Sequence, residues 1–293
     1  MGEEKLTKNE KRVAAREKAA LMRENEKKKR TRRRIAGWIT AGVSVLAVVA
    51  IASFVVYSNN ANKMEVSASS ASNMKTDGVI LTSPTDVVKN TGYNLKSGKP
   101  VSSRDELKNS KVPNIEIYVD YACPHCAEFE ETNSAYLTSV LESGRATVEI
   151  KPVVVLNLPL SFQGGNAAAC IADYAPEKFW DFHTQLFKQD SENGSVTSNL
   201  KTVLKNLDFN SEERAKVNSC VDSDVYKNWL TGATVNALNR TDNGEKVVTG
   251  TPTILVDGFK YNYGPDNFQT FMERVLAGQK PADVSKEAEA NTK

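Results

Sequence analysis

An uncharged run of 23 residues, "IAGWITAGVSVLAVVAIASFVVY" at positions 35–57, constrains this chain more than any other feature. A helix rises about 1.5 Å per residue, so the run is long enough to cross a hydrocarbon layer about 30 Å thick. The segment just before it, "KKKRTRRR", carries seven positive charges in eight residues. Because basic residues flank the cytoplasmic end of a membrane helix, we predict a single transmembrane anchor. Residues 1–34 are then a basic cytoplasmic tail, and residues 58–293 lie outside the cell membrane.

Two other interpretations of this region remain open. A cleaved signal peptide is one, since small residues follow in "VSASSAS" at 66–72, but signal peptides have apolar regions of only about 7–15 residues. A nucleic-acid-binding tail is the other, because residues 1–34 hold 14 basic and 6 acidic residues while the whole chain has a net charge of only +2. A basic segment beside a membrane span fixes topology and contacts anionic lipid, which explains it more simply.

The remainder of the chain divides by composition. Residues 58–91 are rich in Ser, Asn, Thr and Ala and are predicted to form a flexible linker. Residues 92–278 form the predicted globular domain, and residues 279–293 a polar tail. The overall hydrophobic content of 40% and charged content of 25% are ordinary for a globular protein.

Hydrophobic spacing within the globular domain switches between strand and helix periods. The expected order is a strand at 114–119, a helix from Pro124 to about Leu141, a strand at 146–156, a helical block at about 160–240, strands at 252–258 and 259–264, and a helix at 266–277. The first three elements predict a parallel strand pair with a right-handed crossover. We therefore predict an α/β fold with a mixed sheet and an inserted helical domain.

The stretch "YVDYACPHCAEF" at 118–129 places Cys123 and Cys126 where a strand meets a helix. A closed zinc site needs four ligands, and no second closely spaced pair is present in the sequence, so we predict no metal. A purely structural disulfide is a second alternative, but so short a loop gains little from cross-linking. We favour a redox pair, because a cysteine at a helix N-terminus has a stabilised thiolate.

The two residues between these cysteines support the same interpretation. Pro124 suits the first turn of a helix. His125, protonated or donating a hydrogen bond, would lower the thiolate pKa further. A stabilised thiolate means a stabilised reduced form and hence a more oxidising disulfide.

A second motif, "GTPTILVDG" at 250–258, places Thr251-Pro252 at the start of a strand, where proline is tolerated. Together with Cys-Pro-His-Cys this motif is specific. The chain resembles the DsbA family of thiol-disulfide oxidoreductases, in the membrane-anchored form of Gram-positive bacteria. The resemblance covers roughly residues 92–278, and it rests on "DYACPHC" at 120–126, "NAAACIADYAPEKFWDFHTQLF" at 166–187 and "TGTPTILVDG" at 249–258.

The resemblance implies a thioredoxin fold with a helical insertion, and a role for each matched residue. Cys123 resembles the exposed attacking cysteine and Cys126 its buried partner. Pro252 resembles the cis-proline that faces the redox pair, and Thr251 the residue whose backbone pairs with substrate. A disulfide oxidoreductase of this kind needs no cofactor.

One position departs from the family pattern. Thioredoxin-fold proteins often carry a buried acid six residues before the first cysteine, where this chain has Ile117. Glu116 and Asp120 are nearby, but period-two alternation places them on the opposite face of the strand. We assign no acid to proton exchange with Cys126.

The remaining cysteines, Cys170 and Cys220, lie 50 residues apart in the helical block. Family members carry a similar pair, and a disulfide here would contribute roughly 4 kcal/mol in the chain-entropy model. We expect a structural disulfide, with two free thiols or a second redox pair as alternatives. His183, among aromatic residues at helical spacing, is expected to be a packing or capping histidine.

The resulting prediction is an extracytoplasmic oxidase that introduces disulfides into unfolded secreted or cell-surface proteins. The resemblance implies a membrane partner of the DsbB or vitamin-K-epoxide-reductase type that reoxidises it. We expect a monomer, because no separate dimerisation segment is apparent. The alternatives are a reductase or isomerase of the same fold, or a non-catalytic chaperone that holds peptides.

Overall fold

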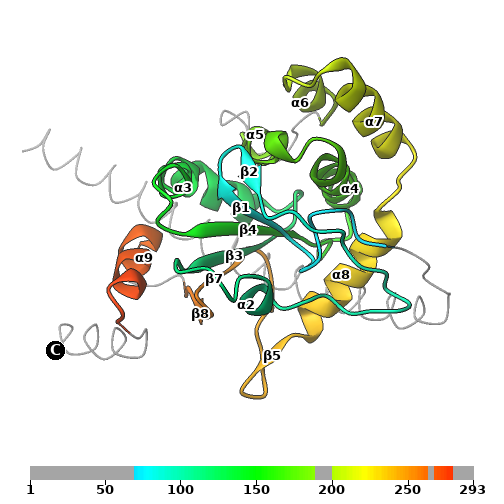
Figure 1. Ribbon diagram of the computed structural model, residues 1–293. Coiled ribbons are helices and arrows are strands. Elements are labelled where there is room, and N and C mark those ends of the chain that lie inside the picture. Colours follow the sequence, from blue (N-terminus) through cyan, green and yellow to red (C-terminus); the bar gives the residue numbers. More distant parts are fainter. Residues whose placement is uncertain (1–68, 189–199, 263–266, 280–293) are drawn as a thin grey trace, which may run out of the picture. The chain divides into compact units, whose positions relative to one another are not determined.

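The computed structural model describes residues 69–188, 200–262 and 267–279 (Figure 1). The predicted anchor at 35–57, the basic tail at 1–34 and most of the polar tail lie outside these residues. Within the described ranges, no helix is both long enough and apolar enough to cross a membrane.

A six-stranded mixed sheet forms the centre of the described region (Figure 1). Its strand order is β2-β1-β4-β3-β7-β8. β3 and β4 are parallel, whereas the other neighbouring pairs are antiparallel. The strands are β1 (Val79–Ser83), β2 (Asp86–Val87), β3 (Asn114–Val119), β4 (Thr147–Pro152), β7 (Thr253–Val256) and β8 (Phe259–Lys260).

The predicted β-α-β unit is present as β3, α3 (Pro124–Glu142) and β4. The predicted hairpin is also present, with β7 and β8 joined at Asp257-Gly258, both of which have positive φ as the tight turn requires. The α/β class and the mixed sheet are therefore confirmed.

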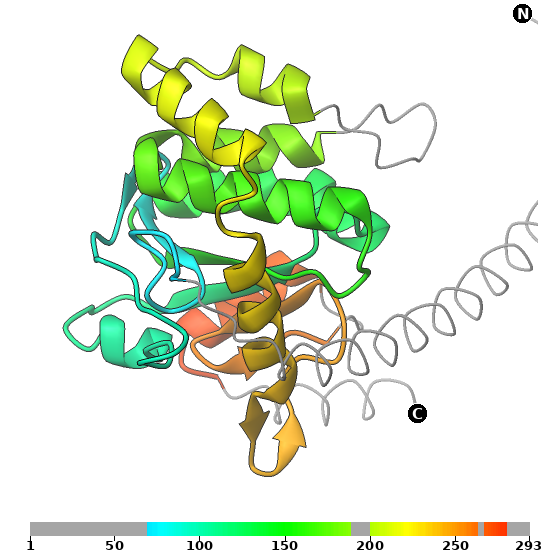
Figure 2. The same ribbon diagram turned by 90° about the vertical axis from the view of Figure 1, so that its right-hand side faces the viewer.

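Helices cover both faces of the sheet (Figure 2). They are α2 (Ser103–Glu106), α3, α4 (Pro159–Tyr174), α5 (Phe179–Phe187), α6 (Leu200–Asn206), α7 (Ser211–Asp222), α8 (Lys227–Asn239) and α9 (Phe268–Leu276). Between β4 and β7 the chain forms α4 to α8, and α6 and α7 lie outside α4 and α5 in Figure 2. A short hairpin, β5 (Thr241–Asp242) and β6 (Glu245–Lys246), follows α8.

Side-chain alternation along β3 separates two sides of the molecule. Ile115, Ile117 and Val119 are fully buried in the main core, on the side of α3 and α9. Phe129 of α3 and Phe268 of α9 pack edge to face there, with ring centroids 5.2 Å apart. The residues between them along β3 point to the opposite side, toward α8.

The predicted linker at 58–91 is wrong for its C-terminal part. Residues 69–91 belong to the fold: β1 pairs with β4, and Ala71 and Met74 are fully buried. The polar residues that suggested a linker form buried turns instead. Asn73 and Asp77 adopt positive φ, and the Asn73 amide donates a hydrogen bond to the carbonyl of Ala172, 99 residues away. Polar composition therefore marked tight turns here.

Candidate active site

The chain turns from β3 into α3 at the two cysteines, and Cys123 is the N-cap residue of α3. Pro124 occupies the first turn, where the missing N–H costs nothing. The Cys123 N–H donates to the carbonyl of Asp120 at 2.9 Å, which closes the turn before the helix. The first N–H groups of α3 have no partner within the helix, so the sulfur of Cys123 lies at its positive end.

The thiol of Cys123 is strongly acidic in this position. Hydrogen bonds from the Cys126 side chain, from Thr251 and from the Cys126 backbone lower its pKa from 9.0 to about 6, although burial and the charge of Asp120 oppose the shift. At neutral pH Cys123 is therefore largely a thiolate. A thiolate is both the attacking form of cysteine and a good leaving group.

Cys126 has the opposite character. It is fully buried one turn into α3, and burial raises its pKa well above the ordinary value. The hydrogen bond to Cys123 and the negative charge of Cys123 raise it further. Two cysteines three positions apart thus have pKa values moved in opposite directions, so one thiol ionises readily while the other retains its proton.

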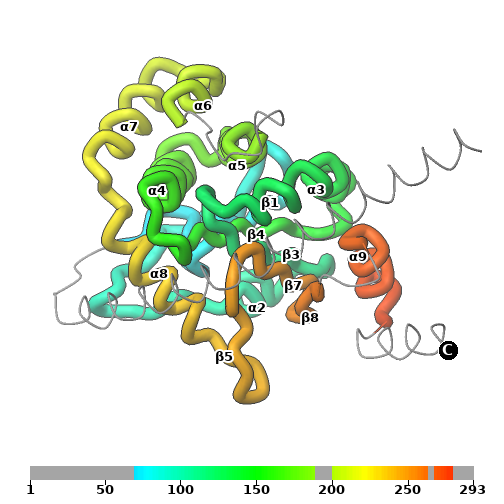
Figure 3. Tube along the Cα trace, turned by 180° about the vertical axis from the view of Figure 1, so that it is seen from behind, coloured from blue at the N-terminus to red at the C-terminus, as the bar shows by residue number. Residues whose placement is uncertain are grey.

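Thr251 and Pro252 lie opposite Cys123, although they are far away in the sequence. β7 pairs with β3, and the peptide bond between Thr251 and Pro252, just before β7, is cis. The sulfur of Cys123 is 3.3 Å from the carbonyl oxygen of Thr251. In Figure 3, β3 and β7 run side by side below α3. Tertiary structure therefore brings together the two motifs that the sequence singled out.

His125 lies in the first turn of α3, between the two cysteines. Its side chain is about half exposed, and Nδ1 lies 3.4 Å from a carboxylate oxygen of Glu128. The groups that lower the pKa of Cys123 are Cys126 and Thr251. A further lowering of the Cys123 pKa by His125, when its ring is protonated or donates a hydrogen bond, stays a prediction.

Asp120 is a residue near both cysteines that sequence reasoning set aside. β3 ends at Val119, so the strand alternation used for Asp120 no longer applies there. Asp120 is fully buried; its oxygens accept hydrogen bonds from the N–H groups of Ala122 and Leu156, each at 2.9 Å. Its negative charge raises the pKa of both cysteines. An Asp three residues before the first cysteine was the available signal.

Cys170 of α4 and Cys220 of α7 are joined in a disulfide, with an S–S distance of 2.05 Å and Cα atoms 5.8 Å apart. The two thiols are therefore not free, which excludes one of the three alternatives, and the structural role expected for this bond stays a prediction. The disulfide ties the outer helix α7 to α4, whereas the thiols of Cys123 and Cys126 are free.

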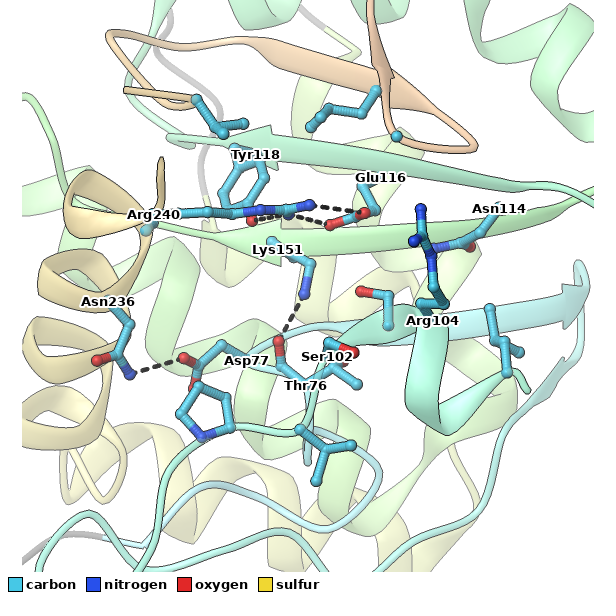
Figure 4. A pocket seen from close by; sticks show the side chains of 18 of the residues that line it. Thr76, Asp77, Ser102, Arg104, Asn114, Glu116, Tyr118, Lys151, Asn236 and Arg240 are labelled. Carbon is cyan, nitrogen blue, oxygen red and sulfur yellow. Dashed lines mark hydrogen bonds and ion pairs between the residues drawn. The ribbon is translucent and has the colours of Figure 1, made fainter. Parts of the chain in front are cut away.

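A polar pocket of about 700 Å³ lies on the other side of β3 (Figure 4). Glu116 and Tyr118 face it from β3, and both contact the Arg240 guanidinium, at 2.5 and 2.7 Å. Burial alone would raise the pKa of Glu116, but Lys151 and Arg240 outweigh it and hold that pKa below its usual value. Glu116 is therefore an ion-paired structural acid and is separated from the thiols by the strand itself.

In the described part of the chain, no group of three or more His, Cys, Asp or Glu residues is arranged to hold a metal ion. What the residues at the N-terminus of α3 can carry out is thiol-disulfide exchange. One acidic thiol and one thiol that keeps its proton lie beside the backbone carbonyl of Thr251. Cys123 is only 4% exposed, so the expectation that the attacking cysteine is exposed is not met in this structure.

A family model described as "Thioredoxin" matches residues 109–274, more than half of the chain. The chain belongs to the thioredoxin family. This confirms the thioredoxin fold and, at that level, the family predicted from the sequence. The predicted enzyme class, a protein disulfide oxidoreductase, agrees with both the family and the site.

Several solved structures are similar to the chain. The MdbA thiol-disulfide oxidoreductase of Actinomyces oris is 25% identical, over 59% of this chain and 84% of that one, with a TM-score of 0.48. Reduced DsbA of Mycobacterium tuberculosis is 21% identical, over 73% and 99%, with a TM-score of 0.49. Oxidised BdbD of Bacillus subtilis is 18% identical, over 72% and 98%, with a TM-score of 0.47. No curated protein matches the chain.

Proposed function

We propose that this protein is an extracytoplasmic oxidase that introduces disulfide bonds into secreted or cell-surface proteins through the Cys123–Cys126 pair. The observation that carries the proposal is the split between the two thiols, because the pKa of Cys123 is lowered to about 6 and that of Cys126 is raised. A stabilised Cys123 thiolate stabilises the reduced enzyme, so its disulfide tends to pass to a substrate.

The reaction is a pair of exchanges. A substrate thiolate attacks the sulfur of Cys123, the Cys123–Cys126 bond breaks, and Cys126 leaves with the electron pair. A second substrate thiolate then attacks the substrate sulfur of the mixed disulfide and releases Cys123 as a thiolate. The substrate is oxidised by two electrons and the enzyme is reduced by two. In this scheme Pro124 starts the helix that stabilises Cys123, His125 lines the exposed side of the site, and Thr251 and Pro252 position the substrate backbone.

The cellular setting of this reaction belongs to the same proposal. The uncharged run at 35–57 anchors the protein, with the basic tail in the cytoplasm and the catalytic domain outside. Unfolded secreted proteins with reduced cysteines are its substrates. A quinone-linked membrane protein of the DsbB or vitamin-K-epoxide-reductase type accepts the two electrons and restores the disulfide.

The redox equilibrium with glutathione tests the proposal. The full-length protein in detergent micelles is equilibrated with mixtures of reduced and oxidised glutathione, and its thiols are counted by alkylation. A potential near about −120 mV, as in strong oxidants of this fold, supports disulfide donation. A value near about −270 mV, as in thioredoxin, overturns it in favour of a reductase. The C170A/C220A double variant is measured in parallel, so that the only titrating pair is Cys123–Cys126.

A further inference from the structure

A basic segment, residues 95–112, runs over the surface of the domain around the short helix α2. It has five basic and two acidic residues, whereas residues 35–293 as a whole have 24 basic and 30 acidic ones. All five basic side chains are exposed: Lys96, Lys99, Arg104, Lys108 and Lys111. The basic segment therefore places an excess of positive charge on an otherwise acidic body.

The protein neutralises these charges only in small part. Of the two acids in the basic segment, Glu106 is largely buried and lies 3.6 Å from the ammonium of Lys75, outside the segment. The other acid, Asp105, accepts a hydrogen bond from the Ser102 hydroxyl at 2.6 Å. Within the described parts of the chain, no ion pair is formed by Lys99, Arg104, Lys108 or Lys111.

Two exposed apolar side chains lie at the C-terminal end of the basic segment. Val112 is 36% exposed and Phe259 of β8 is 38% exposed, although most large apolar residues of the described chain are buried. The two lie at the same end of the sheet, because the N–H of Asp257, just before β8, donates to the carbonyl of Asn114 at the start of β3. Cations and apolar side chains thus share one surface, which is the combination that binds a membrane interface.

The basic segment also borders the polar pocket described above. Arg104 and Lys108 line this pocket, and Figure 4 shows Arg104 on the side opposite Arg240. The guanidinium of Arg104 is 3.7 Å from the position that a Cβ on Gly258 would occupy, so it also lies beside the β7–β8 turn. A hollow of about 700 Å³ with cations at its edge has room for the phosphate of a lipid headgroup.

The chain enters the described domain directly beside the basic segment. Ser69, the first described residue, forms an antiparallel bridge with Asn94, and the side-chain amide of Asn94 donates to the Ser69 hydroxyl at 3.1 Å. The same Asn94 side chain accepts a hydrogen bond from the N–H of Lys96 at 2.9 Å. Only residues 58–68 separate Ser69 from the uncharged run, and eleven residues span at most about 40 Å. A domain tethered at Ser69 therefore has its basic segment within reach of the membrane surface.

We propose that the basic segment docks on the outer surface of the cell membrane and binds the phosphate groups of anionic lipids. The inference rests on the membrane anchor proposed above, and it names the surface of the domain that faces the lipid. Each basic side chain near an anionic membrane strengthens binding by about fivefold, and the tether keeps the domain close to the lipid. Val112 and Phe259 contact the boundary between headgroups and acyl chains.

Docking through this surface sets which end of the domain faces the lipid. The basic segment leads into the first residue of β3, whereas the redox pair follows the last residue of that strand. Six strand residues cover about 20 Å, so β3 holds the docking surface and the redox pair apart. Figure 1 also shows α2 and α3 on opposite faces of the sheet. The docked domain turns Cys123 and Cys126 away from the lipid, so a reoxidising membrane partner reaches them only when the domain leaves the lipid.

Lysine reactivity in lipid nanodiscs tests the proposal. The full-length protein is inserted into nanodiscs of phosphatidylcholine alone or of phosphatidylcholine mixed with phosphatidylglycerol. Acetylation of each lysine by a water-soluble reagent is then followed by mass spectrometry. Lys99, Lys108 and Lys111 should react about fivefold more slowly in the anionic nanodiscs, and the difference should disappear in about 0.5 M salt. Lys201 and Lys205, which are exposed on α6, should react at the same rate in both.

Two matched double variants separate this surface from positive charge in general. Arg104→Gln/Lys108→Gln removes two exposed cations four positions apart, and Lys201→Gln/Lys205→Gln removes two with the same spacing on α6. In the first variant Lys111 should react in anionic nanodiscs at its rate in neutral ones, whereas the second should keep the protection of the parent protein. Thiolate absorbance of Cys123 checks that each variant is folded.

Every other outcome decides against the proposal. Equal lysine rates in the two kinds of nanodisc overturn it, and so does protection that survives in Arg104→Gln/Lys108→Gln. Equal protection of Lys111 in neutral nanodiscs marks an apolar contact that needs no anionic lipid. Protection by soluble polyphosphate but not by anionic nanodiscs assigns the surface to a soluble polyanion.

Two further results keep the test decisive. If Arg104→Gln/Lys108→Gln does not fold, the comparison of Lys111 with Lys205 in the parent protein decides. A full-length protein that does not insert into nanodiscs refutes the anchor and this proposal with it. The redox function is tested separately, by the glutathione equilibrium, so its failure is distinguished from a failure of docking.

Discussion

Cys123 and Cys220 are equally exposed, at 4% each, yet Cys123 is an acidic free thiol and Cys220 is held in a disulfide. Their partners, Cys126 and Cys170, are both fully buried. Burial therefore does not separate the redox pair from the structural pair. Position does: Cys123 caps a helix and faces a loop from a distant strand, whereas Cys170 and Cys220 lie within two helices that pack together.

The comparison also separates local from long-range effects. Cys123 and Cys126 are three residues apart, so a bond between them restricts the unfolded chain little. Breaking and reforming this bond during exchange therefore changes the stability of the fold little through loop entropy. Cys170 and Cys220 close a loop of 50 residues, so their bond mainly restricts the unfolded chain. We expect removal of the first pair to change activity and removal of the second to change stability.

Replacing Cys123 should produce the largest effect. In Cys123→Ser the attacking sulfur is absent, so we expect oxidative folding of a reduced substrate protein to slow by on the order of a thousandfold or more. Cys126→Ser is the informative partner variant, because it keeps Cys123 and should accumulate mixed disulfides visible on a non-reducing gel. Full activity in Cys123→Ser would instead point to a peptide-holding chaperone.

Removing the other pair should leave activity in place. In the C170A/C220A double variant we expect the free energy of unfolding to fall by about 4 kcal/mol, because the unfolded chain regains the entropy of a 50-residue loop. Urea unfolding of the two proteins measures the difference. The rate of exchange at Cys123 is the control, and a large drop in it would mean that Cys170 and Cys220 form a second redox pair.

The pH dependence of the reduced protein gives the smallest effect. The pKa of Cys123 is about 6 in the folded protein and about 8.5 in an unfolded chain. When folding lowers the pKa of an acid, it adds stability to the folded protein. This stability is fully present above the pKa of the unfolded chain, and it is lost as the pH falls through the pKa of the folded protein. Between pH 8.5 and 6 the reduced protein should therefore lose up to about 1.4 kcal/mol per pH unit.

Thiolate absorbance at 240 nm measures the same transition directly. The reduced protein should show one thiolate forming near pH 6 and no second one below pH 9, since the pKa of Cys126 is raised. Cys123→Ser should remove both the absorbance step and the slope in stability. Two thiols titrating together near pH 8.5 would contradict the split between the pair.

A second contrast within the molecule concerns two buried acids. Glu116 is paired with Arg240, and its pKa is lowered. Among the described residues, the polar group next to the Glu130 carboxylate is the imidazole of His183, at 3.2 Å with unfavourable geometry for a hydrogen bond. Leaving a buried polar group unsatisfied costs about 1–3 kcal/mol, and more when it is charged. The fold therefore satisfies the acid on the side of β3 away from the thiols and leaves the one near them unsatisfied. Such exceptions are expected to concentrate at functional sites.

The sequence alone determined the elements whose signals are local. Strand and helix periods gave β3, α3, β4 and the closing helix α9, and Asp257-Gly258 gave the β7–β8 turn. The spacing of Cys123 and Cys126 at a strand-to-helix junction located the site, because a helix N-terminus acts on the residue that caps it. The dipeptide Asn243-Gly244 carried an equally local hairpin signal, for β5 and β6, that was passed over.

Tertiary structure decided everything that depends on contacts between distant segments. Thr251 reaches Cys123 across 128 residues, and His183 reaches Glu130 across helices α5 and α3. The strand β1 was hidden in a polar segment because its stability comes from pairing with β4. Hydrophobic period and capping act over a few residues, whereas the pKa of a thiol or the satisfaction of a buried carboxylate is set by whatever the fold packs beside it. The sequence therefore located the two sulfurs and the acidic one at the helix N-terminus, whereas the contacts with Thr251 and the burial of Cys126, which move the two pKa values apart, come from the fold.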